Sequence, residues 1–295
     1  MVLLWTELRK LEDILVFHDL CVYDKIKGDV QMEKRIEDLN LEDDFLFSRV
    51  MSDEEICRIV LEKILNISIK KIVLPEQQKT IDLLLDSKGV RLDIYVNDDV
   101  GTIYNCEMQR GKRGQLPKRS RYYQGNIDLD SISKGEPYTS LRRSYIIFIC
   151  TFDPFTEGRH IYTFQNTCLE SPGLLLGDEA TKLFLNTKGT IDDIDEEMKE
   201  FLTYIENTTD TFARQAKSSL VKKLHQRVID VKQSKEMEAE YMTLLQRDRE
   251  NIEQGERKMA ALTELLLDQK RTDDLKRAIR DTAYREQLYK QFNIL

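Results

Sequence analysis

The chain has 295 residues, of which 41% are hydrophobic and 33% charged, and its formal net charge is −8. This composition is typical of a globular protein with one main domain plus an accessory region, and the acidic balance argues against a generic nucleic-acid binder. No apolar run approaches the roughly 18 residues of a membrane span. The five cysteines form no C-x-x-C pair, so we expect reduced thiols, no structural zinc and a cytoplasmic location.

Residues 1–31 differ in pattern from the rest of the chain. They carry the only tryptophan, Trp5, within a mixed apolar and charged stretch, and Met32 then opens a segment that resembles an ordinary protein start. We interpret 1–31 as an N-terminal extension read from an upstream start codon. An amphipathic helix docked on the core is the alternative.

The first regular elements are predicted to be helices. From Leu41 the apolar residues follow a helical period, and Asp43 or Asp44 suits the N-cap. Asp53 suits the N-cap of a second helix.

The middle of the chain alternates between strand and helix patterns. The expected elements are strands at 70–79, 90–97 and 102–109, a helix at 116–133 with Pro117 in its first turn, and strands at 145–150, 159–166 and 182–186. This order predicts an α/β fold in which a mixed sheet is flanked by helices.

Beyond Asp192 the pattern is helical to the end. Apolar positions from 234 to 270 follow a heptad-like spacing that Asp248 and Gly255 interrupt, which predicts a weak coiled coil able to pair with a second copy of the chain. Residues 273–294 predict one or two short amphipathic helices.

Three polar residues stand out in the strands at 90–97 and 102–109. They are Asp93, Glu107 and Gln109. Strand positions alternate between faces, so Glu107 and Gln109 share one, and a turn at 97–101 would place Asp93 opposite Asn105 and diagonal to Glu107. Two carboxylates and an amide would then converge in a patch suited to Mg²⁺. An ordinary solvent-facing hairpin is the alternative.

A local basic excess begins immediately after Gln109. Between Arg110 and Arg143 there are nine basic and three acidic residues. Cations beside a carboxylate cluster would suit a phosphodiester substrate, because they neutralise backbone phosphates while the acids hold a metal. A solvated helix face is the alternative.

Seven segments together resemble the PD-(D/E)XK nuclease superfamily, and within it the Rpn family of recombination-promoting nucleases, also described as transposases. They are residues 38–47, 79–84, 91–95, 105–109, 118–125, 145–155 and 159–164. The resemblance implies a restriction-endonuclease-like domain over 32–207 and a helical tail over 208–295.

The resemblance also implies roles. Asp93 and Glu107 would hold Mg²⁺, with Mn²⁺ as the alternative ion, and Gln109 would complete the catalytic group. The superfamily commonly has lysine at the position of Gln109. Glutamine can orient water but cannot supply a positive charge.

The resemblance also extends to residues on the predicted helices. The residues expected to contact DNA are Lys118, Arg119, Arg121 and Tyr122, although the tyrosine could instead belong to the core. Asp44 would be an auxiliary acid, with helix capping as the alternative role.

The predicted function is therefore a Mg²⁺-dependent DNA endonuclease that promotes recombination or belongs to a mobile element. The alternative is a catalytically weak or inactive DNA-binding protein that associates with itself through its tail. A transposase with three acids on an RNase H-like fold is disfavoured, because no third acid stands in a suitable strand.

Overall fold

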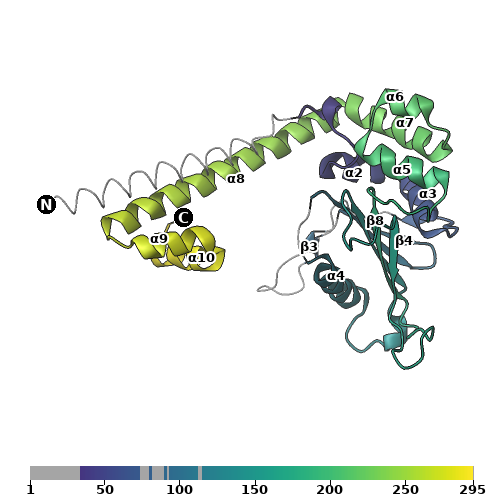
Figure 1. Cartoon of the computed structure of the whole chain (residues 1–295), viewed down its shortest axis with the longest axis horizontal. Helices are drawn as coiled ribbons and strands as arrows, with labels where there is room; N and C mark the ends of the chain where they lie inside the picture. The colour runs from purple at the N-terminus through teal and green to yellow at the C-terminus, as the bar shows by residue number, and fades with distance from the viewer. Residues whose placement is uncertain (1–33, 74–79, 82–89, 92, 112–114, 295) are drawn as a thin grey trace. The chain divides into compact units, whose positions relative to one another are not determined.

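The computed structural model describes residues 34–73, 80–81, 90–91, 93–111 and 115–294. The chain splits into two compact units, Met1–Gln233 and Ser234–Leu295 (Figure 1). The expected division into a nuclease-like domain over 32–207 and a helical tail over 208–295 stays a prediction. The predicted extension 1–31 lies outside the described residues.

The described part of the first unit opens with three short helices. These are η1 (Ile36–Asp38), α2 (Asp44–Met51) and α3 (Glu54–Leu65). The predicted cap at Asp53 is confirmed, since its carboxylate accepts from the backbone N–H groups two and three residues on, each at 3.1 Å. Asp43 occupies the N-cap of α2, but its side chain makes no capping hydrogen bond there.

A six-stranded mixed sheet forms the centre of this unit, in the order β1-β4-β5-β6-β8-β7. The strands are β1 (Ile72–Val73), β4 (Ile94–Asp98), β5 (Ile103–Gln109), β6 (Ser144–Cys150), β7 (Ile161–Phe164) and β8 (Ala180–Asn186). The pairs β5–β6 and β6–β8 are parallel, and the outer pairs are antiparallel. A separate pair joins β2 (Thr80–Ile81) to β3 (Val90–Arg91). The predicted α/β class, with a restriction-endonuclease-like mixed sheet, is confirmed.

The register of β4 and β5 corrects one prediction. Tyr95 pairs with Asn105, so Asp93, just before β4, comes level with Glu107 rather than with Asn105. The error is two residues along the partner strand. Because side chains alternate with a period of two, this shift leaves the predicted face unchanged.

Helices cover the sheet on both sides. Figure 1 shows α4 (Leu116–Ser131) on one side of the strands, with α2 and α3 on the other. Three later helices follow the sheet, namely α5 (Glu196–Glu206), α6 (Asp210–Gln215) and α7 (Ser219–Gln233). α7 packs on α2 and α3, and α5 and α6 pack on α7. The 3₁₀ turn η2 (Tyr138–Ser140) lies between α4 and β6.

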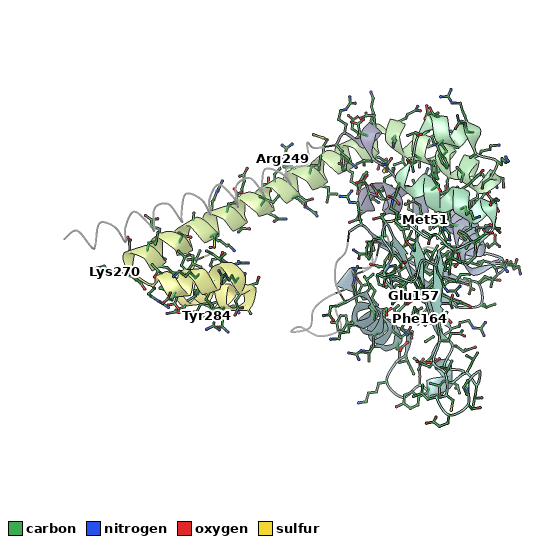
Figure 2. The ribbon with its side chains drawn as sticks, in the orientation of Figure 1. Met51, Glu157, Phe164, Arg249, Lys270 and Tyr284 are labelled. Carbon is green, nitrogen blue, oxygen red and sulfur yellow. The ribbon has the colours of Figure 1, made fainter. Side chains whose placement is uncertain are left out.

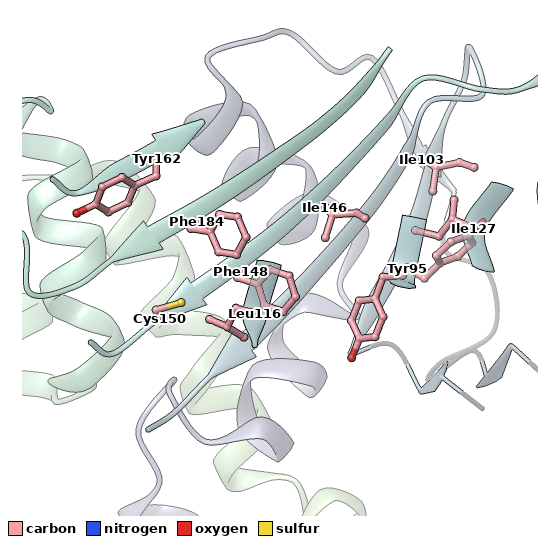
Figure 3. Close-up of a cluster of buried hydrophobic side chains, with 10 residues drawn as sticks. Tyr95, Ile103, Leu116, Ile127, Ile146, Phe148, Cys150, Tyr162 and Phe184 are labelled. Atoms are coloured by element: carbon pink, nitrogen blue, oxygen red, sulfur yellow. The ribbon is translucent and has the colours of Figure 1, made fainter. Parts of the chain in front are cut away.

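An aromatic cluster joins α4 to the sheet (Figure 3). The Phe148 ring stacks on Phe184 of the next strand at 5.3 Å and on Tyr123 of α4 at 6.1 Å between centroids. Each large apolar side chain buried in this way stabilises the fold by about 1.5–3 kcal/mol. The cluster therefore holds α4 over β5 and β6.

The second unit is entirely helical where the structure describes it. It contains α8 (Lys235–Asp268), α9 (Thr272–Arg280) and α10 (Thr282–Gln291), which confirms the predicted short helices near the end. Lys270 turns the chain after α8 with a φ of +58°, and Tyr284 of α10 packs on the small core of this unit (Figure 2). No helix in the described parts of the chain is both long and apolar enough to cross a membrane.

Candidate active site

The polar residues of β5 are buried under α4. Asn105, Glu107 and Gln109 are 0%, 1% and 3% exposed. This burial rules out the solvent-facing alternative. Burying polar groups is costly unless they are hydrogen-bonded, and these side chains have hydrogen-bond partners on α4 and on the neighbouring strand.

Glu107 is surrounded by hydrogen-bond donors. Its Oε2 accepts from Arg119 Nη2 at 2.9 Å and from the Tyr123 hydroxyl at 3.4 Å. Its Oε1 accepts from the backbone N–H of Asp93 at 3.2 Å. The Asn105 amide, in the orientation that satisfies its hydrogen bonds, donates to the same oxygen at 3.2 Å. The carboxylate is thus held in one position by four groups.

Asp93 is hydrogen-bonded to two neighbouring residues of β5, as an acceptor to one and as a donor to the other. Its Oδ2 accepts from the backbone N–H of Met108 at 3.1 Å, while its own N–H donates to Glu107. Burial first, and the charge of Asp93 second, raise the pKa of Glu107 to about 8, although Arg119 opposes the rise. Two carboxylates are therefore held together against their mutual repulsion.

Arg119 of α4 links the members of this site. Its Nη1 donates to Gln109 Oε1 at 2.6 Å and its Nε donates to the Tyr123 hydroxyl at 2.7 Å. The guanidinium carbon lies 5.2 Å from the ring centroid of Tyr123 and 5.4 Å from that of Phe148. Burial, and then Glu107, raise the pKa of Tyr123 to about 12, so its hydroxyl keeps the proton that it donates.

The structure separates the residues predicted to contact DNA. Arg119 lies within the carboxylate cluster, whereas Lys118, Arg121 and Tyr122 are exposed on α4. Successive helical residues are turned by about 100°, so neighbours of an inward-facing arginine point elsewhere. Tyr123, four residues after Arg119, shares its face.

An acid at the start of α2 contacts the residue that follows β5. Asp43 forms an ion pair with Arg110, the residue that follows Gln109, and its other oxygen accepts from the backbone N–H of Asn40 at 2.9 Å. Asp44, the predicted auxiliary acid, is the first residue of α2. Sequence reasoning missed the roles of Asp43 and Asn105. The two-residue spacing from Glu107 could have revealed Asn105, but no local pattern pairs Asp43 with Arg110.

The donor set fits a hard divalent cation. Within the ranges that the structure describes, no group of three or more His, Cys, Asp or Glu side chains is placed to hold a metal, so Asp93 and Glu107 would act as a pair. Mg²⁺ is usually bound through one or two carboxylates together with substrate phosphates. A cation between two repelling carboxylates would also relieve the interaction that raises the pKa of Glu107.

The comparison with known families agrees with this geometry. The model of a family described as PD-(D/E)XK nuclease family transposase matches residues 41–261. The matched region contains Asp93, Glu107, Gln109 and Arg119, and it supports a nuclease-type enzyme with DNA as the class of substrate. No curated protein and no solved structure matches the chain significantly.

Proposed function

This chain belongs to the family of PD-(D/E)XK nuclease family transposases, and from that premise we propose that it is a Mg²⁺-dependent DNA endonuclease. The observation that carries the proposal is the hydrogen-bonded pair of buried Glu107 and half-buried Asp93, which lie level with one another where β4 begins beside β5. A structural role alone would not favour a second carboxylate beside buried Glu107, because burying charge destabilises a fold.

The residues divide the chemistry between them. Asp93 and Glu107 would hold Mg²⁺ or Mn²⁺, which when bound polarises the phosphate and lowers the pKa of water. Gln109, whose Oε1 is held by Arg119, would orient the attacking water. The water oxygen forms a bond to phosphorus and the bond from phosphorus to the leaving sugar oxygen breaks. The water gives up a proton to solvent, and the leaving oxygen takes one.

The exposed residues of α4 would position the DNA. Lys118 and Arg121 would neutralise backbone phosphates, and Tyr122, 40% exposed, would pack against the strand. Such contacts carry no sequence information, which suits an enzyme that acts in recombination or in the movement of an element.

Nicking of supercoiled plasmid by the purified protein tests this function. We expect nicked product with Mg²⁺ or Mn²⁺ and none with a chelator. Asp93→Asn and Glu107→Gln keep the size of each side chain and remove its charge, so both variants should lose nicking and stay folded by circular dichroism. Unchanged nicking in both would exclude the metal site.

A second candidate is a weakly catalytic or inactive DNA-binding protein that associates with itself. Gln109 favours it, because the position holds no charge, and so do the exposed apolar residues Met242 and Ile252 on α8, at 55% and 61%. Duplex binding without nicking, together with dimers in sedimentation equilibrium, would support this alternative. Replacing both apolar residues by Glu should then give monomers.

A further inference from the structure

Arg119 brings a positive charge to the place where Gln109 has none. Its guanidinium donates to Glu107 Oε2 at 2.9 Å and to Gln109 Oε1 at 2.6 Å. The cation that directly follows β5, Arg110, is ion-paired to Asp43 instead. The charge beside the two β5 side chains therefore comes from another element, α4.

The arginine is held firmly but is not sealed from solvent. The Tyr123 hydroxyl fixes Nε at 2.7 Å, and the rings of Tyr123 and Phe148 lie within cation–π distance. The Arg119 side chain is nevertheless 32% exposed, against 1% for Glu107. A phosphate oxygen could therefore reach the guanidinium from solvent.

The hydrogen-bond count leaves donors for an anion. A guanidinium has five N–H groups, and the bonds to Glu107, Gln109 and Tyr123 take three of them. One N–H is left on each terminal nitrogen by this count. Two N–H groups of this kind can bind phosphate oxygens, and charge-assisted bonds to phosphate are among the stronger hydrogen bonds in proteins.

We propose that Arg119 is a catalytic residue that supplies the positive charge for the scissile phosphate from α4, in place of a lysine at position 109. This inference rests on the proposed nuclease function and gives Arg119 a different role from Lys118 and Arg121. Those residues meet the DNA backbone, whereas Arg119 stabilises charge that develops on the phosphate during hydrolysis. Its bond to Gln109 also sets the orientation of that amide.

Moving the charge back to β5 tests the proposal. The variants are Arg119→Gln, Gln109→Lys and the double variant that carries both, with Arg119→Lys as a conservative substitution. Arg214→Gln, at an exposed arginine on α6, is the matched control. For each protein the nicking rate, the melting temperature and the affinity for a short duplex in Ca²⁺ would be measured.

We expect Arg119→Gln to slow nicking by about 10²-fold, since removing one preorganised donor to developing charge has an effect of that order. Arg119→Lys should retain much more activity. The double variant should recover to within about tenfold of wild type, because the lysine introduced by Gln109→Lys restores the charge. The control should match wild type in every measurement.

The melting temperature distinguishes a catalytic role of Arg119 from a purely structural one. A double variant that regains stability but not nicking would show that Arg119 only neutralises Glu107, and would overturn the proposal. So would an Arg119→Gln protein that nicks at the wild-type rate. If Arg119→Gln does not fold, Arg119→Lys and the double variant decide the question on the same criteria.

Failure of the proposed function would look different. A wild-type protein that never nicks DNA refutes the nuclease and with it a catalytic role for Arg119. Duplex affinity then shows whether Arg119 still receives a phosphate. Binding about tenfold weaker in Arg119→Gln and restored in the double variant would support that contact, and unchanged binding would exclude it.

Discussion

The sheet face beneath α4 has two halves that are equally buried and chemically opposite. The β5 half carries Asn105, Glu107 and Gln109, and the β6–β8 half carries Phe148 and Phe184, all at most 3% exposed. Burial stabilises the aromatic half and destabilises the polar half, whose charge has to be offset by donors. The difference separates residues whose burial stabilises the fold from residues whose burial is costly and has to be offset by hydrogen bonds.

Arg119 of α4 contacts both halves of this face. It bonds to Glu107 on one side and lies 5.4 Å from the Phe148 ring centroid on the other. Aromatic packing of α4 therefore sets where the guanidinium meets the carboxylate. The aromatic residues, whose burial stabilises the fold, thus position the guanidinium that hydrogen-bonds to the polar residues of β5.

The largest expected effect comes from breaking the polar half. Glu107→Ala should lower nicking by about 10³-fold or more, because a metal contributes several kcal/mol of transition-state stabilisation. The melting temperature should fall less than in a variant that truncates a buried aromatic residue, because Arg119, which loses its partner, is 32% exposed and can be solvated. Nicking kinetics and thermal melts of the same preparation check this, and a large loss of stability would contradict it.

Breaking the aromatic half should have the opposite signature. Phe148→Ala should lower the free energy of unfolding by about 3–5 kcal/mol, the usual range for a fully buried phenylalanine. Urea unfolding followed by circular dichroism measures the change. Phe164→Ala, at 44% exposure, is the control and should cost much less. Equal losses in the two variants would contradict the assignment of Phe148 to the supporting core.

The pH dependence of stability sharpens the same contrast. Because the pKa of Glu107 is raised in the folded state, its protonated form stabilises the fold below the unfolded value and this contribution is lost as pH rises towards about 8. Glu107→Gln cannot lose a proton, so without metal its stability relative to wild type should increase between pH 5 and 8, by on the order of a few kcal/mol. Denaturant melts in chelator at several pH values measure the difference. A difference that does not change with pH would contradict a raised pKa.

The smallest effect is expected on the exposed side of α4. Lys118→Ala and Arg121→Ala should each flatten the dependence of log affinity for duplex DNA on log salt by about one unit, because each loses one phosphate contact. Titrations in Ca²⁺ at several salt concentrations measure the slope. An unchanged slope in both would place the DNA path elsewhere.

Local sequence features account for much of this fold. Asp53 begins α3 and Pro117 lies in the first turn of α4, as their chemistry predicts. Alternation along β5 predicts Glu107 and Gln109 on one face, and both side chains bond to Arg119 there. The predicted pairing of β4 with β5 was wrong by two residues. Hairpin register depends on how many residues the turn uses, and several residues between 97 and 101 suit a turn.

The sequence by itself determined which residues could carry chemistry, because residue type and a period of two are local properties of the chain. Only the tertiary structure decided that Glu107 and Gln109 are buried, and that Arg119, unlike the exposed Lys118 and Arg121, bonds to Glu107. It also decided that β6 lies between β5 and β8 and that Asp43 meets Arg110. These outcomes depend on packing between segments far apart in the chain, where the aromatic contacts of α4 determine which charges can meet, and no local pattern encodes that choice.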